Sequence, residues 1–132
     1  MHNTTWKNVS GVEQEDHKTT ARDLATLAKE AMKNEFFRET VKTASYTMTD
    51  VSGQIVHQLF TTNQLLGKVS GVEGIKTGWT TQAGECLITQ TTRSSHIIII
   101  VVLNSADRFG ENATLIEWAF KNHEWKMFKM EE

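Results

Sequence analysis

The sequence predicts an α+β fold, in which helices pack on an antiparallel β-sheet. Two amphipathic helical patterns lie toward the two ends of the chain, and β-prone segments separated by short turns lie between them. Short turns between consecutive strands require antiparallel pairing, and helices can cover the apolar surface of such a sheet. With 132 residues, the chain is predicted to form a single domain, or part of one.

The first helix is predicted over residues 20–33. Thr20 and Asp23 resemble a capping box with Asp in place of Glu, and an acidic side chain suits the positive end of a helix. The apolar residues that follow recur at the spacing of one helical face; they are Leu24, Leu27, Ala28, Ala31 and Met32.

A hairpin is predicted next, because residues 46–50 and 54–60 are β-prone and flank Val51-Ser52-Gly53. Three further strands are predicted at 72–80, 86–92 and 96–104. The last of these contains seven consecutive aliphatic residues, of which the first six are Ile or Val. Such a run favours a strand that is covered on both faces.

The closing helix is predicted to begin at Asn112, whose side chain would cap it. One side of this helix would be formed by Leu115, Trp118, Ala119 and Asn122, with Ile116 and Phe120 at its shoulder. Trp118 and Phe120 are predicted to belong to the core.

Composition and charge exclude several functions. The formal net charge is -2 and no basic stripe is present, so nucleic acid is not expected as a partner. The single cysteine, Cys86, excludes a disulfide framework and is expected to be a small buried hydrophobe. The histidines show no metal-ligand spacing, so neither a metal nor an organic cofactor is implied.

The ends of the chain suggest a piece of a longer protein. Proline is absent, the first residues are loop-like, and no signal-peptide pattern opens the sequence. The longest apolar stretch, residues 97–103, is too short to span a bilayer. Any membrane contact is therefore expected only through missing segments or through the tail, where Trp125, Met127, Phe128 and Met130 alternate with charged residues.

The most informative motif is Lys76-Thr77-Gly78, on a predicted strand bracketed by glycines. A substrate that ends in a carboxylate needs a cation and a hydroxyl donor at that end, which Lys76 and Thr77 supply. Gly78 would let a peptide lie against the strand edge, as in strand addition, and the Trp79 N–H could point at a developing oxyanion. On its own, the tripeptide is more typical of a solvated turn.

Several longer blocks of sequence favour the binding role over a solvated turn; they are 17–25, 62–66, 71–80, 83–87, 103–108 and 115–120. In this order and spacing, they resemble the D-alanyl-D-alanine carboxypeptidases, the low-molecular-weight penicillin-binding proteins, in which Lys-Thr-Gly is the third motif. The resemblance covers about residues 6–125 and implies the C-terminal portion of a β-lactamase/transpeptidase-like domain.

The resemblance also implies roles for individual residues. Lys76 and Thr77 would hold the terminal carboxylate of a peptidoglycan stem peptide or of a β-lactam, with Gly78 beside them. The Trp79 amide would form half of an oxyanion hole. Arg108 stands where the family carries an arginine near the cleft. The parent protein would be a serine-type D-Ala-D-Ala carboxypeptidase that acts outside the bacterial cytoplasmic membrane.

One part of the family's machinery is missing from the sequence. The family acylates a serine in a Ser-x-x-Lys motif, yet no serine here is followed three residues later by lysine, and neither Ser-x-Asn nor Tyr-x-Asn occurs. The chain is therefore expected to be inactive alone, as a truncated portion of the enzyme. The alternative is a non-catalytic module that binds peptide or a partner chain. An open sheet edge would also favour dimerisation or domain swapping.

Overall fold

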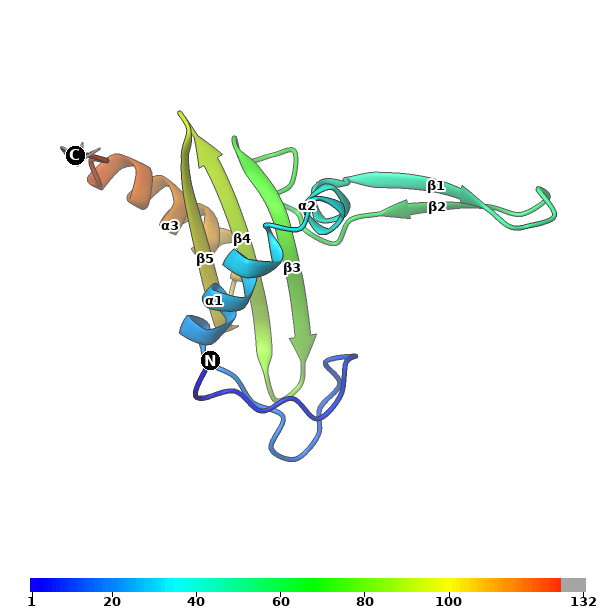
Figure 1. Cartoon of the computed structure of the whole chain (residues 1–132), viewed down its shortest axis with the longest axis horizontal. Helices are drawn as coiled ribbons and strands as arrows, with labels where there is room; N and C mark the ends of the chain where they lie inside the picture. The colour runs from blue at the N-terminus through cyan, green and yellow to red at the C-terminus, as the bar shows by residue number, and fades with distance from the viewer. Residues whose placement is uncertain (127–132) are drawn as a thin grey trace, which may run out of the picture.

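A computed structural model describes residues 1–126 (Figure 1). Its helices and strands are, in chain order, α1 (Ala21–Ala31), α2 (Glu35–Lys42), β1 (Ser45–Thr49), β2 (Val56–Phe60), β3 (Val72–Thr80), β4 (Gly84–Arg93), β5 (His96–Ser105) and α3 (Arg108–Asn122). The tail residues Met127, Phe128 and Met130 lie outside the described part of the chain. No helix in residues 1–126 has the length and apolar character needed to cross a membrane.

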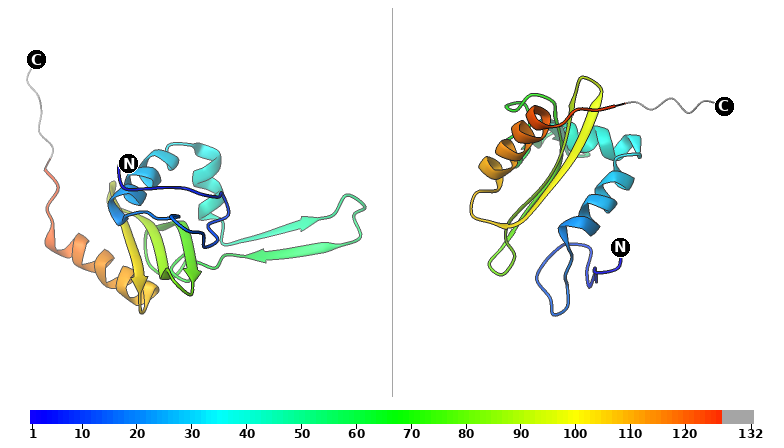
Figure 2. Two further views of the ribbon diagram at one scale, coloured as in Figure 1. Left: turned by 90° about the horizontal axis from the view of Figure 1, so that it is seen from below. Right: turned by 90° about the vertical axis from the view of Figure 1, so that its left-hand side faces the viewer.

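The body of the molecule is a three-stranded antiparallel sheet in the order β3-β4-β5, with α1 on one face and α3 on the other (Figures 1 and 2). This arrangement confirms the predicted α+β fold. The aliphatic run of β5 serves both faces: Ile98, Ile100 and Val102 pack toward α3, while Ile99 packs toward α1. The prediction that this strand is covered on both faces is therefore confirmed.

Helix α1 begins as the capping pattern predicts, because the Thr20 hydroxyl accepts a hydrogen bond from the Asp23 amide at 3.1 Å. On the side of α1 that faces the sheet, Ala28 and the C-cap residue Met32 are buried together with Ile75 of β3. Leu27 departs from the predicted stripe and stays 43% exposed, so the face that packs on the sheet is narrower than the apolar pattern.

Helix α2 is an element that the sequence analysis missed. Asn34 caps it by accepting from the Phe37 amide at 3.0 Å. Its Val41 lies directly over Gly74, where an added Cβ would come within 2.9 Å of the valine side chain. Gly74 also has a φ of +115°, which favours glycine. Close packing against β3, rather than a long apolar pattern, thus holds this eight-residue helix.

Helix α3 begins earlier than predicted. Asp107 is its cap and accepts from the Gly110 amide at 2.9 Å, so Asn112 lies inside the helix and is completely buried. The predicted face was also wrong, because Ile116 is fully buried whereas Trp118 is 55% exposed. Gly110 also makes room for this cap, because an added Cβ there would come within 2.0 Å of the Asp107 carboxylate.

The predicted hairpin is confirmed as β1 and β2, which pair from Ser45↔Phe60 to Thr49↔Val56. It extends away from the body, and every residue of both strands is exposed (Figures 1 and 2). The hairpin and the three-stranded sheet are separate sheets, so β1 and β2 gain no cover from α1 or α3.

Candidate functional site

Strand β3 presents one long edge without a strand partner in the described structure. It pairs with β4 only, from Val72↔Thr91 to Thr80↔Gly84. Along this edge Lys76 and Trp79 are exposed, whereas Thr77 and Gly78 are half-buried. The motif singled out in the sequence therefore lies on regular strand and is accessible, rather than in a solvated turn.

Lys76 and Thr77 are neighbours on β3, and both line the groove beside this strand. Neighbouring residues of a strand point to opposite faces, but the Lys76 ammonium folds back and donates to the Thr77 carbonyl. The cation is thus held beside the Thr77 residue instead of extending into solvent. A positive charge thus lies at the backbone of the residue that carries the hydroxyl group, and a cation and a hydroxyl donor are what an anionic chain end requires.

A third side chain joins them from the loop that precedes β3. The Oγ1 atoms of Thr62 and Thr77 are 2.7 Å apart and share one hydrogen bond. The Thr62 loop is fixed on both sides: the Thr61 amide donates to the Ala44 carbonyl at 2.8 Å, and buried Asn63 accepts from the Leu65 amide at 3.1 Å. Thr62 is therefore positioned by backbone bonds on one side and by the core on the other.

These residues border a groove of about 780 Å³ between α2, the foot of the hairpin and β3. The wall formed by α2 and the foot of the hairpin is mainly apolar but also carries Glu39, Thr40 and Thr43; its apolar residues are Phe36, Val41, Tyr46, Leu59 and Phe60. The other carries Thr62, Lys76 and Thr77. A groove with one apolar side and a compact cationic and hydroxylic side suits an extended ligand that has an apolar body and an anionic end.

Gly78 is not required by the packing of the chain itself. An added Cβ would meet only the Cys86 Cβ, at an ordinary contact distance of 3.7 Å, and no positive φ is present. Cys86, expected to be buried, is only half-buried on β4 next to Gly78.

Arg108 lies under the same part of β3. Its guanidinium donates to the Gly78 carbonyl at 2.8 Å and stacks over the Phe109 ring, 4.8 Å from the ring centroid. Its backbone amide donates to the Glu85 carboxylate at 3.1 Å. The structure therefore brings Arg108 to the motif strand, where it holds the backbone of Gly78 rather than facing the groove with Lys76.

Glu73 anchors the strand behind the motif. Burial alone would raise its pKa, but hydrogen bonds from Gln90, Thr92 and Lys42, with the Lys42 charge, outweigh that effect and lower it. Gln90 and Thr92 donate at 2.7 and 2.8 Å, and the Lys42 ammonium lies 3.1 Å from the carboxylate. Through Lys42, this carboxylate ties α2 to β3 and so fixes two walls of the groove.

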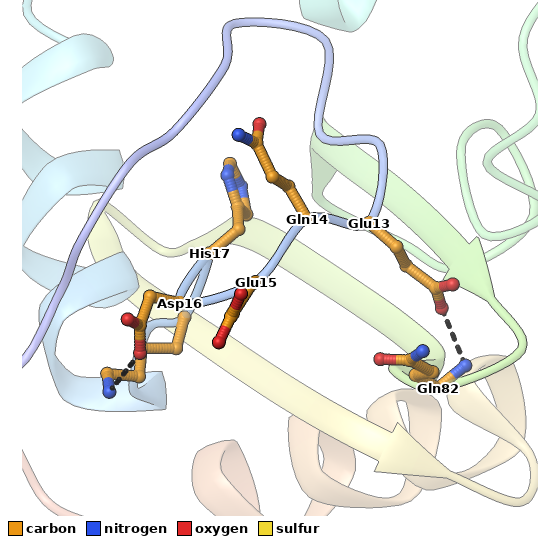
Figure 3. A pocket seen from close by; sticks show the side chains of 7 residues that line it. Glu13, Gln14, Glu15, Asp16, His17 and Gln82 are labelled. Carbon is orange, nitrogen blue, oxygen red and sulfur yellow. Dashed lines mark hydrogen bonds and ion pairs between the residues drawn. The ribbon is translucent and has the colours of Figure 1, made fainter.

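A second hollow lies under the N-terminal loop and is lined by acidic residues and His17 (Figure 3). Glu13 accepts from the Gln82 amide at 2.7 Å, and the pKa of Glu13 is lowered by hydrogen bonds from Thr80 and Gln82. Asp16 pairs instead with Lys18, at 3.1 Å. No group of three or more potential metal ligands is found in residues 1–126. The hydrogen bond between Glu13 and Gln82 fastens the N-terminal loop to the turn between β3 and β4.

Sequence reasoning missed two components of the groove. Thr62 belongs to a block that resembles the family, but no role was given to it, because a hydroxyl pair across fifteen residues leaves no periodic signal. The wall from α2 was missed with the helix itself. The signal that could have revealed the helix is the Asn34 cap followed by Phe37 and Val41 at helical spacing.

Comparison with known proteins identifies similar chains. A family model described as D-alanyl-D-alanine carboxypeptidase matches residues 1–107. A D-alanyl-D-alanine carboxypeptidase of Streptomyces sp. strain K15 is 38% identical over 109 residues, covering 80% of this chain and 38% of that protein. One from Bacillus subtilis is 31% identical over 130 residues, covering 94% of this chain and 32% of that protein.

Solved structures agree with these matches. The Streptomyces K15 DD-transpeptidase superposes with a TM-score of 0.84 at 32% identity, covering 92% of this chain and 49% of that one. A penicillin-binding protein of Listeria monocytogenes, solved in its cefotaxime-bound form, superposes with a TM-score of 0.75 at 31% identity, covering 89% and 48%. The chain thus spans 32–38% of the length of these curated relatives and about half of the solved chains.

Proposed function

The chain belongs to the D-alanyl-D-alanine carboxypeptidase family, and we propose that it forms the carboxylate-binding side of a serine-type active site of that family. The observation that carries this proposal is the exposed edge of β3, where Lys76 and Thr77 stand together beside an apolar groove. The ligand class is a peptide that ends in D-Ala-D-Ala, or a β-lactam. The parent enzyme would act on peptidoglycan outside the cytoplasmic membrane.

Each motif residue has a role in this proposal. Lys76 pairs with the terminal carboxylate, and the Thr77 hydroxyl donates to one of its oxygens. The peptide lies along the edge at Gly78, where no side chain obstructs its backbone. Backbone groups of alternate strand residues face the same edge. The carbonyl of Thr77, which Lys76 contacts, and the amide of Trp79 therefore serve one side.

The Trp79 amide is proposed as one of two oxyanion donors. Arg108 supports it indirectly, because its bond to the Gly78 carbonyl fixes the peptide unit whose nitrogen belongs to Trp79. Arg108 is thus proposed to shape the substrate-binding edge from below. Removing one oxyanion donor of this kind typically costs about a hundredfold or more in turnover.

The nucleophile must come from a polypeptide outside these 132 residues, because the sequence has neither Ser-x-x-Lys nor Ser-x-Asn. We expect this chain alone to remain unlabelled by a fluorescent penicillin. Adding a fragment of a family member that carries Ser-x-x-Lys should restore labelling, with the covalent adduct on that fragment. A covalent adduct on this chain alone would show that a nucleophile is present and contradict the proposal.

Non-covalent binding tests the carboxylate site separately. An acetylated Lys-D-Ala-D-Ala peptide, titrated by NMR, should shift amide signals of residues 76–79 first. Since a hydrogen bond to a charged group contributes about 1.5–3 kcal/mol, Lys76→Ala should weaken binding by roughly tenfold or more. Lys68→Ala removes the same charge from an exposed position outside the groove and is the matched control.

The second candidate function is a non-catalytic binding module. It is favoured by the exposed apolar residues beside the groove, among them Phe36 at 82% and Phe60 at 73% exposure. Under this hypothesis the chain binds another polypeptide, or a second copy through the open β3 edge. Sedimentation at high concentration separates the two: self-association that is unaffected by the peptide ligand would support the module.

A further inference from the structure

We infer that Thr62 is a positioning residue that directs the Thr77 hydroxyl toward the ligand carboxylate, an inference that rests on the proposed function. The observation behind it is the single hydrogen bond between their Oγ1 atoms, 2.7 Å apart. The two residues come from different elements, the loop after β2 and the strand β3, so only the fold brings them together.

The number of hydroxyl protons limits which hydrogen bonds can form at this site. Each threonine hydroxyl has one proton to donate and lone pairs to accept, whereas an ionised carboxylate only accepts. If the Thr77 hydroxyl donates its only proton to Thr62, it cannot donate to the ligand. Thr77 can serve the carboxylate only when Thr62 is the donor in their shared bond. A bound carboxylate therefore fixes the direction of hydrogen-bond donation: Thr62 donates to Thr77, and Thr77 donates to the carboxylate.

The structure keeps Thr62 in place for this task. Its loop is fastened by the bond between Thr61 and Ala44 at the hairpin foot, and by buried Asn63 on the following side. Asn63 Oδ1 accepts from the Leu65 amide, and Leu65 belongs to the core under α3. Thr62 is thus an exposed hydroxyl on a rigid base, and little conformational freedom is lost when it orders Thr77.

The arrangement also strengthens the donor. A hydroxyl that accepts one hydrogen bond is polarised and becomes a better donor in the next. The Lys76 ammonium adds a positive charge at the backbone carbonyl of the same residue, Thr77. Thr62 is therefore expected to act through Thr77 on anionic ligands, without touching the ligand carboxylate.

The test is a double-mutant cycle on the complete 132-residue chain, read by NMR titration with acetylated Lys-D-Ala-D-Ala and with its C-terminal amide. Thr62→Val replaces the hydroxyl by a methyl group of similar size. It should weaken binding of the acid by about three- to tenfold, the worth of one ordinary hydrogen bond. Thr62→Ser should restore binding, and the amide ligand should respond less, because its nitrogen can also donate.

The cycle separates positioning from general damage. In a Thr77→Val background, Thr62→Val should have almost no further effect, since the two residues act as one unit. Equal losses for the acid and the amide, or additive losses in the double variant, overturn the inference. Wild-type affinity for the acid in Thr62→Val overturns it while leaving the proposed function standing. Failure of the wild-type chain to bind either ligand overturns the proposed function, and this inference with it.

Discussion

The three-stranded body and the β1–β2 hairpin use the same kind of strand sequence with opposite results. In the body, β4 carries Leu87, Thr89 and Thr91 with 0–1% exposure, because α3 covers that face. In the hairpin, Tyr46 and Leu59 pair across the ladder and remain 61% and 49% exposed. A β-ladder can thus form from the local sequence pattern, whereas burial of its side chains requires another element, such as a helix, to cover the strands.

The candidate site lies where these two regions meet. Its polar wall comes from β3 of the body, and much of its apolar wall comes from the foot of the hairpin. The rigid side holds the groups that need fixed geometry, Lys76 and Thr77, and the exposed side offers apolar surface without a covering layer. If burial determines stability, a substitution in the body should lower the free energy of unfolding far more than a matched substitution in the hairpin.

The largest effect is expected for Ile116→Ala in α3. Ile116 is fully buried, so the truncation leaves a cavity and should lower the free energy of unfolding by about 2–5 kcal/mol. Urea unfolding followed by circular dichroism measures it. The matched change Ile55→Ala, at a position 57% exposed beside β2, should cost less than about 0.5 kcal/mol. Similar losses of unfolding free energy at the two positions would contradict the expected difference between the body and the hairpin.

A polar substitution sharpens the same contrast. The Thr89 hydroxyl donates to Asn112 Oδ1 at 2.7 Å, and both residues are completely buried. Thr89→Val leaves that oxygen without its donor and should cost about 1–3 kcal/mol in urea unfolding. Thr47→Val makes the same chemical change on the exposed hairpin and should be close to neutral. A neutral Thr89→Val would mean that water replaces the lost donor.

The attachment of α2 to β3 should depend on pH. Glu73 has a lowered pKa in the folded chain, so its contribution to stability is present above its ordinary value of 4.5 and is lost as pH falls through the lower folded value. Wild type should therefore exceed Glu73→Gln in stability at pH 7, and the difference should shrink below about pH 4.5. Glu124→Gln, at an exposed position, is the control. A difference that grows on acidification contradicts this sign.

The smallest effect on stability is expected on the apolar face of the hairpin. The double change Tyr46→Thr and Leu59→Thr keeps strand propensity and removes only exposed surface, so unfolding should change by less than about 0.5 kcal/mol. The same variant should reduce self-association in sedimentation if that face binds a second copy. A loss above about 1 kcal/mol would indicate that the hairpin is covered in solution.

The motif and the fold could be predicted from sequence to different depths. Lys76, Thr77, Gly78 and Trp79 were singled out because a short motif with a chemical rationale stands on a β-prone segment, and their roles are a proposal. The start of α3 was wrong because capping patterns are local and ambiguous: Asp107 and Asn112 both suit a cap, and only packing of Asn112 against Thr89 decides between them. Helix α2 was missed because the strand on which it packs, β3, lies about thirty residues away in sequence.

By itself, the sequence determined the α+β class, the hairpin and the chemical character of the third motif, because strand periodicity, turn residues and a charged tripeptide are all local signals. Only the tertiary structure decided that β3 stands at an open edge, that Lys76 folds onto the Thr77 carbonyl, and that Thr62 reaches the Thr77 hydroxyl. These relations depend on tertiary packing or on the conformation of one side chain. No periodicity along the chain encodes them.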